Sequence, residues 1–430
     1  MKLIYDIDQK PPIKKNLVFA FQQVLAIMAA TLLVPLLVGD PLNQPAALCG
    51  AGFGTLFYIF VTKKMSPVFL GSSFAFISPL IGAASCGCLG ILLGAIFAGL
   101  IYVLIALVIM KTGSAWVNKL LPPVVIGPTV ALIGLSLCGS AVTNLTNTNG
   151  GAEMYSLVHI ALGIFAFLTT VWASVKGPKW MRMIPFIIGI GAAYIVGLLL
   201  TLCGLDVINV AAFNDMKFVK LPQFLIIGAF TGKGGTITSF SDVLNIFMLF
   251  APVAFVVLAE HIADHKNLSS IVNRDLITEP GLHRTLIGDG VGSIIGSLFG
   301  GCPNTTYGES VGCVAITGNA SVSTIIIAAI YCIILSFLDP FTCFVNSIPS
   351  CITGGVCIAL YGFIAVSGLK MVQNVDLGDN RNLFVVAAIL VCGIGGLELH
   401  LGPITISAIA TALILGIVVN VVFNKGNNKA

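Results

Sequence analysis

The chain reads Gly-Gly-Cys-Pro-Asn-Thr-Thr-Tyr-Gly-Glu-Ser-Val-Gly from Gly300 to Gly312, between two apolar runs. Non-helical backbone persists at membrane depth only where protein buries it or where it lines a polar cavity. An acid at that depth marks a functional site by default. The stretch therefore predicts an interrupted membrane segment with Glu309 in a binding site. The alternative is a capping box, in which Thr306 and Glu309 only close a helix start.

The composition indicates that this segment belongs to an all-α polytopic membrane protein. Of 430 residues, 57% are hydrophobic and 9% are charged, whereas soluble domains carry about 25% charged residues. We expect no signal peptide and no separate soluble domain. The formal charge of +4 does not indicate a nucleic-acid partner. The twelve cysteines are scattered without a CxxC pair, which favours packing over a metal site or disulfides.

Apolar runs of membrane-spanning length can be placed at twelve positions along the chain. Two shorter segments, Ser66–Ala84 and Cys302–Thr317, are interrupted by glycine, proline and polar residues. Together they predict fourteen membrane segments.

Basic residues support this number of segments. With fourteen crossings, eighteen of the 21 Lys and Arg lie on one side, including Lys2, Lys425 and Lys429 near the ends. The other three lie in the long loop Gly204–Asp242, and long loops contribute little to the positive-inside rule. We therefore expect both termini to be cytoplasmic.

The long loop divides the fourteen segments into two sets of seven. Seven is odd, so the halves have inverted topology, and each interrupted segment is the third of its half. Paired interrupted segments at matching positions indicate a transporter's binding site near the midplane. We expect Ser72 or Ser73 to cap one short helix and Thr306 the other. The alternative is that the glycines and prolines only serve helix packing and kinks.

A second charged group follows the apolar run Asn245–Ala259. On a helix, Glu260 and Asp264 share one face, as do His261 and His265. Two carboxylates at this spacing repel when both are ionised, so we expect the pair to hold a proton near neutral pH. The alternative places Asp264 and His265 in water at the helix end. A zinc site is disfavoured, because the zincin motif needs Glu directly after the first His.

The remaining polar and aromatic residues give weaker signals. Asp289 lies about two turns into a span, and we expect a structural role for it. His159 and His400 lie near segment ends and are expected at the membrane interface. Phe74 and Tyr307 lie in the interrupted segments and could stack on a flat ligand, although aromatic side chains in membrane segments usually pack.

Several blocks resemble the nucleobase–ascorbate transporter family, and within it the bacterial uracil permeases. The resemblance runs along nearly the whole chain. Its blocks are Gln22-Gln23 with Ala29–Pro35, Leu70–Pro79, Ala259–His261, Asp275-Leu276 with Pro280–Arg284, Pro303–Glu309, and Leu360–Gly362. The blocks around Glu309 and Leu70–Pro79 are highly specific.

The resemblance implies two inverted repeats divided into a core domain (16–110 and 243–338) and a gate domain (124–203 and 348–423). It implies a short strand before the short helix in segments 3 and 10. It also implies proton symport and a homodimer. The sequence shows no nucleophile–base pair with credible spacing, so an intramembrane enzyme is disfavoured, and we expect no cofactor. The residues implied to form the substrate site are Glu260, Glu309, Phe74, Gly308, Tyr307, Ala30 and Tyr361.

We therefore expect a proton-coupled uracil symporter, with xanthine or another purine as the alternative substrate and an anion transporter of the same plan as a second alternative. The proton is expected to use Glu260 with Asp264 or His265. The chain departs from the family pattern where Gln-His is common, at Gln22-Gln23, and where Asn usually follows the glutamate, at Ser310. It also has Asp264 where uracil permeases carry His. Because of these departures, the sequence does not decide which base is transported or whether Asp264 or His265 relays the proton.

Overall fold

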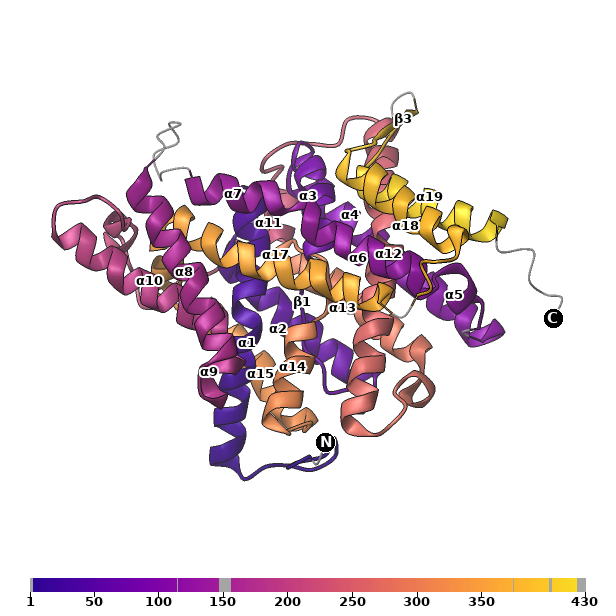
Figure 1. The fold of residues 1–430 in the computed structure, drawn as a ribbon. Coiled ribbons are helices and arrows are strands. Elements are labelled where there is room, and N and C mark those ends of the chain that lie inside the picture. The colour runs from indigo at the N-terminus through magenta and orange to yellow at the C-terminus, as the bar shows by residue number, and fades with distance from the viewer. Residues whose placement is uncertain (1–2, 114, 147–155, 374, 402–403, 424–430) are drawn as a thin grey trace.

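The computed structural model describes residues 3–113, 115–146, 156–373, 375–401 and 404–423 (Figure 1). The first half contains α1 (Ile13–Val38), α2 (Gln44–Val61), β1 (Leu70–Ser72), η1 (Phe74–Phe76), α3 (Ile77–Ala84), α4 (Gly87–Thr112), α5 (Ala115–Leu120), α6 (Pro123–Ser136), α7 (Cys138–Thr146), α8 (Leu157–Val175), α9 (Lys179–Met183) and α10 (Pro185–Leu202). The long loop carries η2 (Val210–Phe213) and α11 (Leu225–Phe230). The second half contains α12 (Phe240–Val272), η3 (Ile277–Gly281), α13 (Leu282–Gly300), β2 (Asn304–Thr306), α14 (Gly308–Thr317), α15 (Val322–Ser336), α16 (Asp339–Ser347), α17 (Ser350–Val372), α18 (Asn380–Ile394), β3 (Leu399–Leu401), β4 (Ile404–Ile406) and α19 (Ala408–Phe423).

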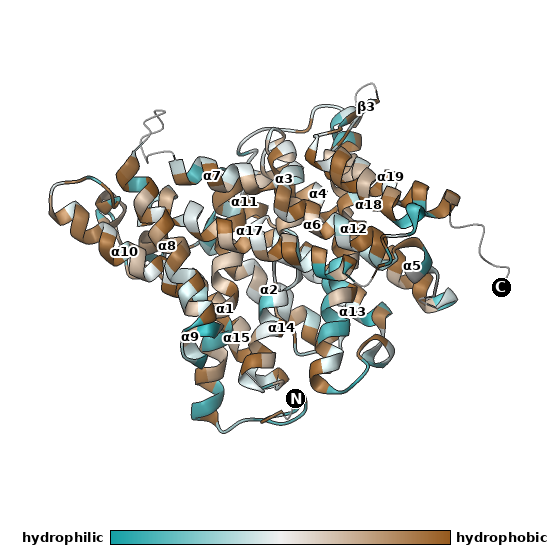
Figure 2. Ribbon diagram, viewed as in Figure 1, coloured by the Kyte–Doolittle hydropathy of each residue, from teal (hydrophilic) through white to brown (hydrophobic). Residues whose placement is uncertain are grey.

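Fourteen membrane segments follow from these elements, as predicted. Among the described residues, eight helices are long and apolar enough to span a membrane, and four shorter apolar helices accompany them. The more polar α13 and the interrupted β2–α14 bring the number to fourteen. Brown residues dominate the outer helices in Figure 2, whereas teal residues inside the protein gather near α12 and α13.

The two interrupted segments meet at the centre of the protein. Strands β1 and β2 pair antiparallel, with Leu70 opposite Thr306 and Ser72 opposite Asn304. In Figure 1, α3 runs upward from this pair and α14 runs downward. The strands predicted in segments 3 and 10 are confirmed. Their backbone N–H and C=O groups pair with each other, as they must at membrane depth, where no water is available.

Glycines allow α13 to pack closely between α2 and α4. A side chain at Gly50 of α2 would collide with the carbonyl of Gly296, and one at Gly99 of α4 would collide with that of Gly290. Small residues at such contacts allow membrane helices to approach closely. This packing fixes α13 behind the paired strands, where the hydroxyl of Ser293 donates a hydrogen bond to the carbonyl of Asn304.

The helices pack in two sets. In the first set, α2 contacts α13 and α15, and α13 also contacts α4, with α1 and α12 beside them. In the second set, α17 contacts α6, α7, α8 and α10, and α18 contacts α6 and α19. Contacts between the sets include those of α12 with α6 and α19 and of α1 with α10.

Two features near the membrane surfaces were not predicted. Strands β3 and β4 form a hairpin before α19, with the exposed His400 beside Thr405. On the other side, residues 3–9 form a strap against the turn between α14 and α15, where the Ile4 amide donates to the Gly318 carbonyl at 2.7 Å.

Arg274, just beyond α12, fastens this strap. Its guanidinium donates hydrogen bonds to Asp8 at 3.0 Å and to Asp6 at 2.8 Å, and these contacts raise the pKa of Arg274. The strap thus joins the ends of α12 and α14. Lys2, Lys425 and Lys429, on which the predicted cytoplasmic placement of the termini partly rests, lie outside the described residues.

Candidate functional site

The candidate site lies where α12 passes the start of α14. Thr306 ends β2, and its hydroxyl donates a hydrogen bond to the Asp264 carboxylate at 2.9 Å. Gly308 opens α14, and a Cβ atom added there would lie 3.5 Å from the second carboxylate oxygen of Asp264. The structure therefore brings Asp264 to the interrupted segment, and the interpretation of Asp264 as an ordinary residue in water is wrong.

The predicted side-chain caps are absent. Tyr307, not Thr306, occupies the cap position of α14, and no side chain there accepts a hydrogen bond from the helix amides. Thr306 cannot serve because it still belongs to the strand, so its hydroxyl faces α12. Ser73 occupies the cap position of η1, but its side chain makes no capping bond either. The capping box of Thr306 and Glu309 is therefore wrong, although the Glu309 carboxylate does accept from its own backbone N–H. Neither short helix has a side-chain cap from the residue before it.

Glu260 and Glu309 are half-buried acids on α12 and α14. The charge of Glu260 lies within electrostatic reach of both Asp264 and Glu309. No cation lies among the groups that act on Glu260. The arrangement offers carboxylate oxygens as hydrogen-bond acceptors beside helix N–H donors.

Tyr307 is fixed rather than free. Its hydroxyl donates to the Ser72 carbonyl at 2.8 Å and lies 3.3 Å from the Thr31 hydroxyl. A side chain at Gly71 would collide with the Tyr307 ring. Tyr307 thus binds β1 to β2 and to α1, next to the buried Ala30.

Phe74 and Tyr361 form the aromatic contact between the two helix sets. Their ring centroids lie 5.8 Å apart with an interplanar angle of 78°. Phe74 comes from η1 and Tyr361 from α17. Both side chains are buried, so this edge-to-face pair joins η1 of one helix set to α17 of the other.

Sequence reasoning missed a buried pair behind the site. His261 Nδ1 lies 2.7 Å from the Asp289 carboxylate, and its Nε2 lies 3.0 Å from the Thr285 hydroxyl. All three side chains are fully buried. Asp289 is therefore buried against a helix neighbour, as a structural role requires, and each ring nitrogen of His261 has a polar partner. The position of Asp289 inside a span was the only sequence signal.

His265 is also buried, so its placement in water at the helix end is wrong. Its Nδ1 lies 2.8 Å from the His261 carbonyl, and its Nε2 lies 2.7 Å from the Tyr58 hydroxyl. A carbonyl only accepts, so Nδ1 carries the proton. The Tyr58 hydroxyl donates to Ser66 at 2.8 Å, and the Ser66 hydroxyl lies 3.3 Å from Nε2. The two His rings stack with centroids 4.1 Å apart.

Gln23 and Ser310, two residues that differ from the family pattern, contact each other. The Gln23 amide donates a hydrogen bond to the Ser310 hydroxyl. The same hydroxyl accepts from the Phe69 amide at 3.0 Å. Ser310 follows Glu309, so this pair ties α1 and the start of β1 to the helix that carries the acid.

The chain matches the sequence profile of the Permease family over residues 14–402. It is 40% identical to the uracil permease of Bacillus caldolyticus over 98% of this chain and 95% of that protein. It is 38% identical to the uracil permease of Bacillus subtilis (strain 168), over 94% and 91% of the two chains. Identity to the uracil permease of Escherichia coli (strain K12) is 32%, over 97% and 93%.

Solved structures of the same fold are more distant in sequence. The transmembrane domain of the cyanobacterial bicarbonate transporter BicA superposes with a TM-score of 0.64 at 14% identity, over 95% of this chain and 97% of that one. The murine anion transporter Slc26a9 in its inward-facing state gives 0.71 at 11% identity, over 96% and 69%. At these identities the likeness concerns the fold, which is the inverted repeat of seven segments predicted from the sequence.

Proposed function

Since the chain belongs to the Permease family, that of the nucleobase–ascorbate transporters, we propose that this multi-pass membrane transporter imports uracil together with a proton. The relatives named uracil permeases cover nearly its full length. The observation that carries the proposal is the juxtaposition of two uncapped helix starts with two half-buried glutamates.

The chemistry of uracil suits these groups. The base is neutral and flat, with two N–H donors and two carbonyl acceptors. Glu260 and Glu309 accept from the N–H groups, and the backbone amides at Phe74 and Gly308 donate to the carbonyls. Ala30 and Tyr361 border the base, and Tyr307 holds the two strands that present it.

A neutral solute gains nothing from the membrane potential, so accumulation needs a co-transported cation. We propose that the proton moves between Glu260 and Asp264. The hydrogen bond from Thr306 to Asp264 supports this route, because it links the second acid to the strand that precedes the substrate helix. His265 is the weaker candidate, since both its nitrogens already have partners.

The transport cycle follows from the two helix sets. We propose that segments 1–4 and 8–11 form the core that carries the base, and that segments 5–7 and 12–14 form the gate. The Phe74–Tyr361 contact lies across this division. We further propose a homodimer in the inner membrane with both termini cytoplasmic.

The alternatives differ in the groups they need. Xanthine has the two N–H donors and two carbonyl acceptors of uracil in its six-membered ring, and it and other purines are the rival substrates. An anion transporter of this fold would need a cation or bare helix starts, and the acids Glu260, Asp264 and Glu309 oppose it. The test is uptake of labelled uracil into vesicles under an imposed pH gradient, competed by xanthine. Competition by uracil alone supports the proposal, and stronger competition by xanthine contradicts it.

A further inference from the structure

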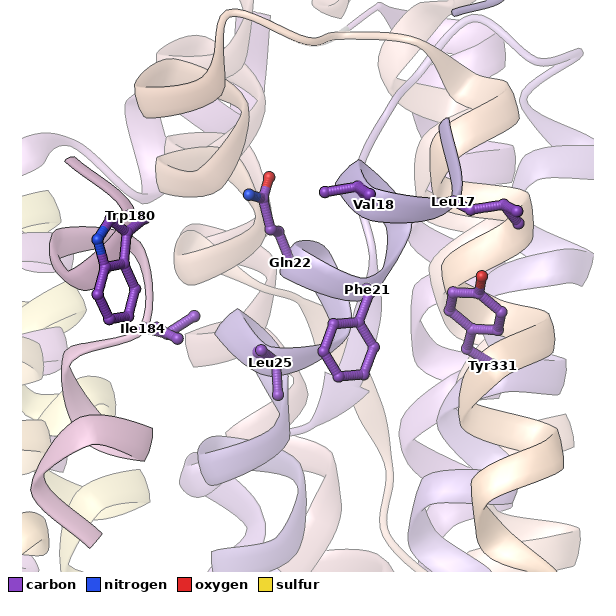
Figure 3. Close-up of a pocket in the computed structure, with 8 residues that line it drawn as sticks. All are labelled: Leu17, Val18, Phe21, Gln22, Leu25, Trp180, Ile184 and Tyr331. Atoms are coloured by element: carbon purple, nitrogen blue, oxygen red, sulfur yellow. The ribbon is translucent and has the colours of Figure 1, made fainter. Parts of the chain in front are cut away.

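Two neighbouring hollows lie beside α1, and we call them together the α1 groove. The first has a volume of about 550 Å³, and the second about 320 Å³. Both are lined by Phe21 and Leu25. Figure 3 shows Trp180 and Ile184 facing α1 across the first hollow. The second continues toward Leu36 between α1, α10 and α16.

The lining of the α1 groove matches one leaflet of a membrane. On α1, Lys14, Val18, Phe21, Leu25 and Met28 share one helix face by their spacing. From Val18 to Met28 the helix rises about 15 Å, which is half of a hydrocarbon core about 30 Å thick. An acyl chain that starts at Val18 therefore ends near mid-membrane, within the groove.

The Lys14 end of the groove is polar. The Gln22 side-chain oxygen is buried there and has no hydrogen-bond partner among the described residues, and Figure 3 shows this side chain pointing into the space between Trp180 and Val18. Trp180 is half-exposed on α9, and Lys179 precedes it. Tryptophan and lysine are the side chains that mark the headgroup level of a membrane.

We propose that the α1 groove binds one phosphatidylglycerol-type lipid, with an acyl chain along α1 and the phosphate near Lys14 and Lys179. An anionic phosphate complements the two lysines, as polybasic sites attract anionic lipids. The lipid lies where α1 meets α10, so it stabilises the arrangement of the two helix sets seen here.

The chain offers a matched pair of reporters. Trp172 on α8 and Trp180 on α9 are exposed by 50% and 51%, but only Trp180 lines the groove. One variant, Trp116→Phe with Trp172→Phe, keeps Trp180 alone, and the other, Trp116→Phe with Trp180→Phe, keeps Trp172 alone. Each full-length variant is reconstituted in phosphatidylcholine and titrated with lipids brominated on the acyl chain near the glycerol.

We expect brominated phosphatidylglycerol to quench Trp180 at an at least fivefold lower mole fraction than brominated phosphatidylcholine, since each lysine contributes roughly a fivefold preference. Trp172 should be quenched equally by both. Lys14→Gln with Lys179→Gln should remove the preference at Trp180. Equal quenching of Trp180 by both lipids, the same preference at Trp172, or a preference that survives loss of both lysines would overturn the proposal.

Discussion

Replacing Asp264 by Asn separates binding from energy coupling. The amide keeps an oxygen that accepts from Thr306, whose bond to the carboxylate is 2.9 Å long, but it cannot carry the proton. A hydrogen bond to a charged group contributes about 1.5–3 kcal/mol, and a neutral one about 1 kcal/mol. The loss is therefore about 1 kcal/mol, or a fivefold weaker affinity at most if all of it reaches the site.

Accumulation should be lost altogether, whereas binding should persist. A gradient of one pH unit is worth about 1.36 kcal/mol per proton, which supports a tenfold uracil gradient when one proton is coupled. In proteoliposomes with the membrane potential clamped at zero, the parent should approach that ratio, and Asp264→Asn should stay near an equal distribution. Equilibrium binding of labelled uracil is measured on the same preparation.

The controls address the hydrogen bond and the neighbouring imidazole. Thr306→Val removes the bond but keeps the acid, so accumulation should persist. If Asp264→Asn still accumulates uracil tenfold, the relay assigned to Asp264 is wrong. If His265→Asn binds uracil but loses accumulation, the proton uses His265 instead.

Three further predictions concern the packing around the site. Asp289→Asn should destabilise the protein by about 1–3 kcal/mol, because the buried hydrogen bond to His261 is disturbed and leaves buried polar atoms unpaired, and a thermal unfolding scan in detergent measures it; an unchanged midpoint contradicts the pairing. Gly71→Ala should cost about 1–3 kcal/mol by overpacking against Tyr307 and should weaken uracil binding with it, which parental binding and stability would disprove. Arg274→Gln should cost less than about 1 kcal/mol, as expected of an exposed ion pair, and the difference from the parent should disappear at high salt; a salt-independent loss argues against the strap's ion pairs.

The sequence was informative where composition conflicts with membrane depth. Proline, glycine and Glu309 within an apolar region predicted the interrupted segment, and the alternation of basic residues predicted fourteen segments. Contacts between helices that are distant in the sequence could not be predicted from it. The His261–Asp289 pair joins residues on two helices, and no local pattern says which acid a buried histidine meets.

The caps were mispredicted for a related reason. Thr306 precedes a helix and carries the right hydroxyl, but its pairing with Leu70 keeps it in a strand. That pairing depends on a segment more than two hundred residues away. Likewise, the contact between Gln23 and Ser310 explains two departures from the family pattern together, although each looks independent in the sequence.

The central claim is that Glu309 holds the substrate at the start of α14. Its most direct test is equilibrium binding of labelled uracil to purified parent and Glu309→Ala, with unfolding midpoints measured alongside. Glu309→Gln, which keeps one acceptor oxygen, serves as the matched variant. We expect no measurable binding by a folded Glu309→Ala protein and weakened binding by Glu309→Gln. Parental affinity in Glu309→Ala would contradict it.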